Sequence, residues 1–302
     1  MSQLITLHSG TAARTGLKRL GASAKLALRA LLARSASSRW LQLLNSHPMF
    51  TELVKAKPQL VYKIYRPYLS KKFSCDQRVE LLGAHYRFIL RQGMAALTVR
   101  AARASVAIGG VTGKSGLPYV IRLSAVDHME REGDLALQLL QGGAAVYTCA
   151  FSFFALAADA PGRSGMGLFV GCMQGPRDAR GLELIKEATR ELHGLRPKNL
   201  MIRLLARIAH EQGCGELRLV GNDNRAAWRA ARRGKVHADY DALWAELGAE
   251  RRADGDHTLP CAAPAEPDLA LVPSKKRSEV RKRHEMLTQL GDAVCAALRA
   301  GV

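Results

Sequence analysis

At about residue 117 the spacing of apolar residues changes from a helical repeat to short segments typical of β-strands. This change limits the folds that the chain can adopt. Four segments rich in strand-forming residues follow one another, at 117–126, 134–140, 145–154 and 166–175. The breaks between them carry Gly, Asp and Pro, which are typical of hairpin turns. Leucines alternate with smaller or polar residues in the second segment, as expected of a strand with one buried face. We therefore expect an antiparallel meander.

Two helices and a further strand are predicted after the meander. The first helix spans 179–194 and ends at His193-Gly194, and the second begins at Pro197 and runs to Gly213. Proline suits the first turn of a helix because its missing N–H needs no partner there. The segment 215–222 then has the composition of a short strand, and the crossover allows it to pair in parallel with the fourth strand. The predicted fold class is α+β, with an antiparallel meander continued by a helix-strand-helix crossover.

The chain divides into four predicted parts. We expect a basic amphipathic leader at 1–39, a helical N-terminal region at 40–105, an α+β core at 110–260, and a Pro-rich link with a basic C-terminal tail at 261–302. Within the helical region His85 lies on an apolar face. That position fits either a catalytic histidine or a hydrogen-bonded core residue.

The leader has a helical repeat of leucines beside a repeat of cations, and residues 1–51 contain no Asp or Glu. The apolar positions are Leu17, Leu20, Ala24, Leu28 and Leu31, and the cations are Arg14, Lys18, Lys25 and Arg29. This pattern is typical of a helix that lies on an anionic bilayer, although a helix packed on the main domain has a similar one. The longest apolar runs fall well short of the roughly 20 residues of a membrane-spanning helix.

The charge balance predicts an anionic partner. Lys and Arg number 45 against 26 Asp and Glu, which gives a formal net charge of +19. We expect an anionic phosphate-bearing ligand or carrier, with contact at the inner-membrane surface as a further expectation. Nucleic acid is not expected, because the chain has no recognised DNA- or RNA-binding motif. The six cysteines form no CxxC pair, which favours reduced thiols in the cytoplasm and no metal site.

The stretch "HGLRPKNLM" (193–201) is the best candidate for an anion site. A helix start offers unpaired N–H groups and the positive end of the helix dipole. Arg196 and Lys198 add two cations beside that start, and Asn199 adds an amide donor. The alternative is a simple helix connection with both cations in solvent. There is no Gly-rich nucleotide loop of the P-loop type.

Other polar residues are candidates for the rest of a site. Glu132, in the turn before a strand, and His193, beside the anion site, are the candidate catalytic bases. His193 equally fits a structural role at a helix C-terminus. Gln174 and Gly175 end one predicted strand, and Asn222 ends another. Together with Arg196, Lys198 and Asn199, these three residues are candidates for cofactor binding. Ordinary turns explain their positions as well.

Several motifs in order resemble the VirK/YbjX family of Gram-negative bacteria, also described as the DUF535 group. They are "REGDLALQL", "GCMQGPR", "ATRELHGLRPKNL", "DYDALWAELGA" and "SKKRSEVRKRH". The resemblance covers residues 45–290. It implies an envelope- or virulence-associated protein, linked to resistance against cationic antimicrobial peptides.

The order of elements also resembles the GNAT acyltransferase fold, although an additional helix at 179–194 precedes the helix that would hold the cofactor. This resemblance implies a fold in which that helix binds a pyrophosphate, and it implies CoA or the phosphopantetheine of an acyl carrier as the cofactor. Two functions therefore remain open. One is an acyltransferase that uses a phosphopantetheine thioester, and the other is a non-catalytic cationic factor at the membrane.

Overall fold

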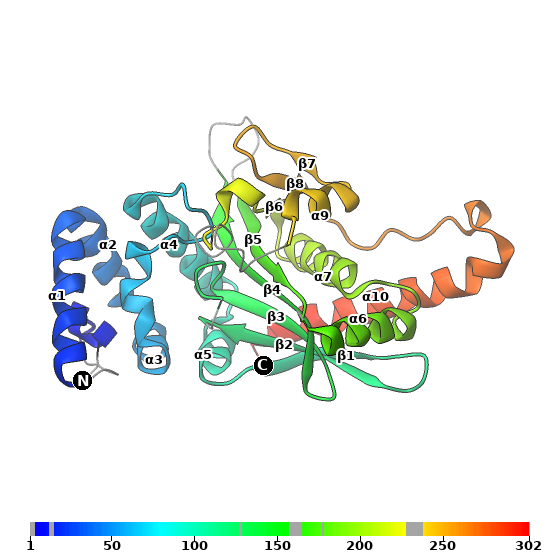
Figure 1. Ribbon diagram of the computed structural model, residues 1–302, viewed down its shortest axis with the longest axis horizontal. Coiled ribbons are helices and arrows are strands. Elements are labelled where there is room, and N and C mark those ends of the chain that lie inside the picture. The colour runs from blue at the N-terminus through cyan, green and yellow to red at the C-terminus, as the bar shows by residue number, and fades with distance from the viewer. Residues whose placement is uncertain are drawn as a thin grey trace.

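The computed structural model describes residues 4–11, 15–126, 129–156, 165–176, 178–227 and 238–301, and Figure 1 shows its arrangement. A sheet stands at the centre, and the N-terminal helices gather at one end of it. Beyond the last strand the chain runs out as an extended link before a long C-terminal helix returns to the sheet.

The sheet has eight strands in the described residues, in the order β1-β2-β3-β4-β5-β6-β8-β7. All neighbours are antiparallel except β5 and β6, which are parallel. The strands are β1 (Val106–Thr112), β2 (Pro118–Ala125), β3 (Leu135–Gln141), β4 (Ala144–Ala155), β5 (Met166–Gln174), β6 (Cys214–Leu219), β7 (Glu250–Arg251) and β8 (His257–Leu259). The predicted meander is confirmed as β2 to β5, and so is the GNAT-like α+β fold class with its parallel crossover.

Strand β1 was not predicted from the sequence. Its segment contains Gly109-Gly110, a pair that is more typical of a turn. The structure shows why a glycine is needed here, since a Cβ on Gly109 would lie 2.7 Å from Cγ2 of Val294 in the C-terminal helix. The pair therefore allows a helix to approach the strand closely.

Two helices make the crossover between the parallel strands. They are α6 (Ala179–Glu191) and α7 (Pro197–Glu211), with Pro197 in the first turn of α7 as predicted. The apolar face of α7 carries Leu200, Leu204 and Leu205, which are buried. This face packs on β3, β4, β5 and β6, so the start of α7 is fixed relative to the sheet.

The N-terminal region is helical, and most of it packs into the same hydrophobic core as the sheet. Its elements are η1 (Leu7–Thr11), α1 (Gly16–Leu32), α2 (Arg34–Leu44), α3 (Pro48–Ala56), η2 (Pro58–Tyr65), α4 (Cys75–Arg91) and α5 (Ala95–Arg103). One continuous cluster of buried residues includes Trp40 from α2, Phe151 from β4 and Leu205 from α7. Arg14 and the side chains of Leu17 and Lys18 lie outside the described residues.

A buried ion pair connects these helices to the sheet. Lys63 Nζ lies 2.8 Å from Asp134 Oδ1, and both side chains are almost inaccessible to solvent. Tyr86 donates to the same carboxylate at 2.7 Å, and Tyr68 donates to its other oxygen. The Asp134 N–H donates to Ser152 Oγ at 2.8 Å. These bonds satisfy a carboxylate in the protein interior, where an unpaired charge is very costly.

The basic C-terminal segment forms η4 (Leu269–Leu271) and α10 (Ser274–Ala300). The first turns of α10 carry the predicted cations and are exposed, whereas its second half is apolar at helical spacing. Leu287, Leu290, Val294 and Leu298 are buried against β1 and α7. The segment is therefore a structural element of the core.

Candidate functional site

The parallel strands β5 and β6 separate part-way along their length. They pair over 166–170 and 214–219, and the last bond between them runs from Val220 N to Val170 O at 3.0 Å. Beyond this point β5 continues beside β4 to Gln174, after a register shift at Gly171. The chain after β6 bends away at Gly221. A gap between main chains therefore opens at 171–174 of β5.

Tyr240, the first residue of α9 (Tyr240–Glu246), fills this gap. Its hydroxyl accepts a hydrogen bond from Met173 N at 2.9 Å. The hydroxyl proton is directed to Met173 O at 3.0 Å or to Cys172 Sγ at 3.2 Å. Burial raises the pKa of Tyr240 well above its usual value, so the phenol remains protonated. Trp244, also from α9, donates to Val220 O at 2.8 Å and fixes the helix against the end of β6.

Asn222, a predicted cofactor-binding residue, orients this tyrosine. It begins η3 (Asn222–Asn224), just after β6. Its Oδ1 accepts from Tyr240 N at 2.9 Å, and its Nδ2 donates to Asp239 Oδ1 at 2.7 Å. Asp239 is the N-cap of α9, as its position predicts, and accepts from Ala242 N at 3.1 Å. The amide of Asn222 therefore joins the end of β6 to the start of α9.

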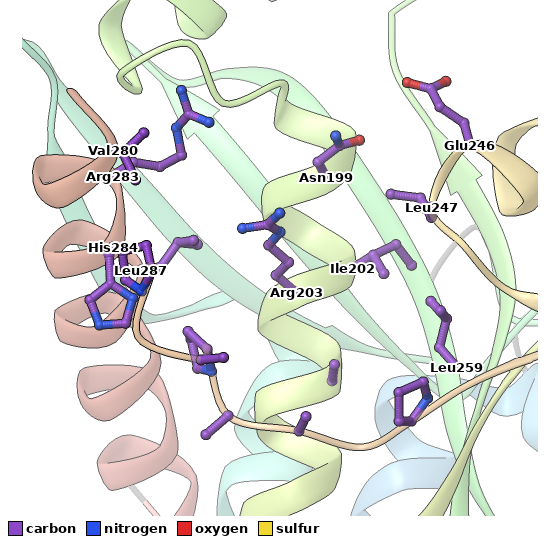
Figure 2. A pocket seen from close by; sticks show the side chains of 17 residues that line it. Asn199, Ile202, Arg203, Glu246, Leu247, Leu259, Val280, Arg283, His284 and Leu287 are labelled. Atoms are coloured by element: carbon purple, nitrogen blue, oxygen red, sulfur yellow. The ribbon is translucent and has the colours of Figure 1, made fainter. Parts of the chain in front are cut away.

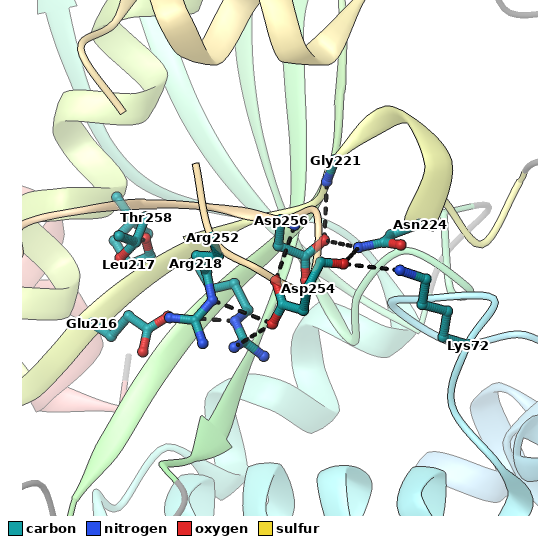
Figure 3. Close-up of polar contacts among 10 residues, drawn as sticks. All are labelled: Lys72, Glu216, Leu217, Arg218, Gly221, Asn224, Arg252, Asp254, Asp256 and Thr258. Carbon is teal, nitrogen blue, oxygen red and sulfur yellow. Dashed lines mark hydrogen bonds and ion pairs between the residues drawn. The ribbon is translucent and has the colours of Figure 1, made fainter. Parts of the chain in front are cut away.

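The loop after β6 is held by the β7–β8 hairpin, as Figure 3 shows. Asp256 accepts from Gly221 N at 3.0 Å and from Asn224 Nδ2 at 2.7 Å. Asp254 binds the guanidinium groups of Arg218 and Arg252 at 3.1 and 3.3 Å. Because this network fixes Gly221 and Asn224 on either side of Asn222, it also fixes the residue that orients Tyr240.

Glu132, one of the two predicted bases, lies at the same segment of β5. Its carbonyl oxygen is so close to Gly171 that a Cβ there would be only 2.0 Å away. Burial raises the pKa of the Glu132 carboxyl to about 7, and the neighbouring Arg131 opposes this rise. The main chain of Glu132 therefore lies beside Gly171 of β5, and the Tyr240 hydroxyl lies at Met173. Their environments favour a carboxyl that titrates near neutral pH and a phenol that stays protonated.

His193, the other predicted base, lies elsewhere. It has a positive φ of 52° at the end of α6 and lines a hollow with residues of β1, β2 and α10. Burial and the nearby Lys114 and Lys282 lower its pKa. His193 lies beside β1 and the start of β2, whereas Glu132 lies in the loop between β2 and β3, against Gly171 of β5. The structure does not bring the two bases together.

The two cations of the predicted anion site are paired with one carboxylate. Arg196 Nη1 lies 2.7 Å from Glu246 Oε1, and Lys198 Nζ contacts Glu246 Oε2. Both cations lower the pKa of Glu246, with the Lys198 hydrogen bond as the larger influence. Glu246, at the end of α9, therefore binds both cations, while the Arg196 side chain remains 60% exposed. A simple helix connection and an anion site both fit these contacts.

A pocket of about 550 Å³ adjoins these cations. Tyr147, Ile185 and Thr189 line it together with Lys186, Arg190, Arg196, Pro197 and Lys198. Gly175 packs beside it, because a Cβ there would lie 3.0 Å from the Tyr147 ring and 3.1 Å from Ile185. Gln174 is the last residue of β5, paired with Thr148 of β4. Gln174, Gly175, Arg196 and Lys198 therefore lie around one end of the gap, whereas Asn199 lines a different pocket on the far side of α7.

The fold and this gap define a GNAT-like α+β protein with a tyrosine between its diverging parallel strands. A family model described as "Protein of unknown function (DUF535)" matches residues 15–296. The chain therefore belongs to the DUF535 family, which includes the YbjX proteins of Gram-negative bacteria. The resemblance to this family read from the sequence motifs is confirmed.

The chain is also similar to two curated proteins and to one solved structure. "Uncharacterized protein YbjX" of Escherichia coli (strain K12) is 29% identical over 280 residues, covering 91% of this chain and 83% of that protein. "Membrane protein LapB" of Mannheimia haemolytica is 28% identical over 180 residues, covering 59% of this chain and 73% of that protein. A solved cAMP-binding acyltransferase from Mycobacterium smegmatis is similar at 14% identity and a TM-score of 0.29, over 71% of this chain and 61% of that chain.

Tyr240 is the residue that sequence reasoning missed. It stands in an amphipathic helix with Leu243, Trp244 and Leu247, and that spacing predicts a core aromatic. The prediction of burial is right, since Tyr240 is 3% exposed. Only the pairing of β5 with β6 shows that this buried hydroxyl lies on an unpaired stretch of main chain.

Proposed function

We propose that the protein is a GNAT-like acyltransferase that takes its acyl group from a phosphopantetheine thioester, either CoA or an acyl carrier, and acts on a molecule of the bacterial envelope. One observation carries this proposal: the Tyr240 hydroxyl lies on the unpaired main chain of β5 at Met173, and the main chain of Glu132, whose carboxyl has a pKa raised to about 7, passes close to Gly171 two residues earlier. These two groups have the properties that acyl transfer requires of a base and an acid.

The proposed reaction uses each group once. Glu132 takes a proton from the amine or hydroxyl of the acceptor, which attacks the thioester carbon. The carbon–sulfur bond then breaks, and the leaving thiolate takes the proton of Tyr240. A phenol already 3.2 Å from Cys172 Sγ can contact a sulfur atom at this place. Arg196 and Lys198 would hold the phosphate of the pantetheine arm, beside the start of α7.

Ligand entry requires a rearrangement of α9. The amides of a pantetheine arm would pair with the main chain of Met173, as a neighbouring strand does. The Tyr240 hydroxyl makes those bonds in this structure, and Glu246 binds the two cations. Both ends of α9 must therefore release these contacts before a thioester occupies the gap, and the Tyr240 hydroxyl would move from Met173 to the thioester sulfur.

Calorimetric titration with CoA and thiol release from acyl-CoA in the presence of envelope extracts test this proposal. General acid catalysis contributes about 10²- to 10⁴-fold, so Tyr240→Phe should slow thiol release by about 100-fold. The variant should bind CoA at least as well as wild type, because it loses the hydroxyl group that binds the main-chain N–H and carbonyl of Met173. Tyr62→Phe, a change in the N-terminal region, is the matched control. Failure of the wild-type protein to bind CoA or to release thiol would reject the proposal.

A second candidate, a non-catalytic cationic factor at the inner-membrane surface, is favoured by a different observation. Helix α1 buries Leu26 and Ala30, whereas Leu20, Leu28, Leu31 and Leu32 are 59–80% exposed. At 100° per residue these leucines lie on the side of α1 turned away from the protein, with Lys25 and Arg29 beside them. Such a face fits the interface of an anionic bilayer. None of the described helices is long and apolar enough to cross a membrane.

Vesicle sedimentation tests this candidate. Burying one leucine contributes about 1.5–3 kcal/mol, so Leu28→Ser with Leu31→Ser should weaken binding to phosphatidylglycerol vesicles by at least about 100-fold. Leu182→Ser with Leu271→Ser removes two leucines that are also more than half exposed, at positions outside α1, and should leave binding unchanged. Equal binding of both double variants would reject a membrane role for α1.

A further inference from the structure

A second pocket lies on the outer side of α7, between α7, α10 and the extended link, as Figure 2 shows. Its volume is about 600 Å³, within the range of pockets that hold small molecules. Residues 260–267 of the link cross in front of it. It does not include the gap between β5 and β6 or any residue given a role there in catalysis.

Two arginines place positive charge in this pocket. Arg203 projects from α7 into the space between the two helices, and Arg283 comes from α10 (Figure 2). Arg203 has no hydrogen-bond or ion-pair partner among the residues that the structure describes. Arg283 uses its Nε to donate to His193 O at 2.9 Å, which leaves its terminal nitrogens for another partner. Burial and the charge of Arg283 lower the pKa of Arg203, as expected of a cation with no counter-charge.

The nearby carboxylates are already neutralised. Glu246 lies at one edge of the pocket, but it binds Arg196 and Lys198. Glu279, one turn before Arg283, binds Lys114 Nζ at 3.0 Å. Glu279 also interacts electrostatically with Arg283, so this carboxylate faces two cations, Lys114 and Arg283. Arg203 and Arg283 together therefore keep an excess of positive charge that attracts an anion from outside the chain.

The remaining wall of the pocket is mostly apolar. Ile202, Ala206, Leu247, Leu259, Val280 and Leu287 line it, together with three prolines of the link. Asn199, in the first turn of α7, has a buried Oδ1 with no hydrogen-bond partner among the described residues. The oxygen and nitrogen of an asparagine side chain are distinguished only by their surroundings. Either the oxygen or the NH₂ group of Asn199 can therefore face a ligand. The pocket thus combines a cationic side with an apolar side.

We propose that this pocket binds an amphiphile with an anionic headgroup, a phosphate or a carboxylate on an alkyl chain. The headgroup lies between Arg203 and Arg283, where guanidinium groups bind planar or tetrahedral anions through charged hydrogen bonds. The chain lies along Ile202, Val280 and Leu287. The pocket shares Glu246 with the surroundings of the predicted anion site, but the proposal itself does not depend on the proposed acyl transfer.

Calorimetric titration of the full-length protein with dodecyl phosphate, below its critical micelle concentration, tests the proposal. Each of Arg203→Gln and Arg283→Gln should weaken binding by about tenfold, and the double change by about 100-fold. The matched control is Lys275→Gln with Arg281→Gln, which removes two exposed cations from α10 outside the pocket and should change affinity less than twofold. Val280→Trp, which fills the apolar side, should also weaken binding at least tenfold.

Three further ligands separate the parts of the proposal. Dodecanoate should bind if a carboxylate headgroup is sufficient. If dodecyl phosphate binds and dodecanoate does not, the site is specific for phosphates. Inorganic phosphate should bind at least tenfold more weakly than dodecyl phosphate, and equal affinity would overturn the role of the apolar wall. Dodecanol should not bind. Equal loss of affinity in the pocket and control double variants would overturn the site.

Discussion

Replacing Asp134 by asparagine should destabilise the protein more than any other single polar change in its core. The substitution keeps the shape of the side chain but leaves the ammonium of Lys63, which is 3% exposed, without a counter-charge. It also replaces one acceptor oxygen by an NH₂ group, although Tyr68 and Tyr86 both donate to this carboxylate. Removing one partner of a buried ion pair costs about 3–5 kcal/mol.

A double-mutant cycle separates the charge from the packing. Lys63→Met should cost less than Asp134→Asn, because the carboxylate keeps two phenol donors and the Ser152 hydroxyl nearby. The combined variant leaves no unpaired charge, so it should cost at least about 2 kcal/mol less than the sum of the single changes.

Urea unfolding followed by far-UV circular dichroism measures these values, with an unchanged m-value as the test that the transition itself is the same. Trp40 and Trp244 add a check, because they lie in the N-terminal helices and beside the sheet. Their fluorescence should change in one transition if the buried pair joins both parts. Single variants that lose less than 1 kcal/mol, with additive effects, would refute the reasoning.

Three other changes test titratable groups. Burial lowers the pKa of His85 to about 4, so its contribution of about 3 kcal/mol is present above pH 6.5 and is lost as the pH falls toward 4. His85→Asn keeps an acceptor for Phe153 N and should flatten this dependence in urea titrations at pH 4 and 7. Because the pKa of Glu132 is raised to about 7, its protonated carboxyl is accommodated in the folded protein below pH 4.5, and this contribution to stability is lost as the pH rises through 7. Glu132→Gln, which cannot ionise, should therefore have a higher melting temperature than wild type at pH 8.5 but not at pH 4. Glu246→Gln should strengthen CoA binding several-fold by freeing Arg196 and Lys198, and weaker binding would count against the anion site.

The meander and the crossover could be predicted because each rests on local patterns. Alternation defines β2 to β5, and Pro197 with Gly213 marks the two ends of α7. Strand β1 and the buried half of α10 depend on each other, since Gly109 lies against Val294 across a separation of more than 180 residues. Neither segment is defined by its own sequence alone.

The site was predictable only in part, for the same reason. Arg196 and Lys198 are recognisable as cations at a helix start, but their partner Glu246 lies about 50 residues away in α9. Lys63 and Asp134 likewise come together only in the tertiary structure. His85 is a buried residue that accepts a hydrogen bond from Phe153 N at 3.2 Å, which confirms the core interpretation of that histidine.

Helix α9 connects the two features that a thioester ligand would need. Tyr240 at its start holds the main chain of Met173, and Glu246 at its end holds both cations of α7. The helix has only seven residues, and of these only Tyr240 and Trp244 are buried. Because one short element makes both contacts, a ligand that displaces one end of α9 weakens the contact at the other end.

If the displaced state of α9 is a minor fraction of the protein, the apparent affinity for the ligand falls in proportion to that fraction. Tyr240→Phe and Glu246→Gln should therefore each raise CoA affinity, and together they should raise it further, whereas a rigid site with no movement of α9 would respond to neither change.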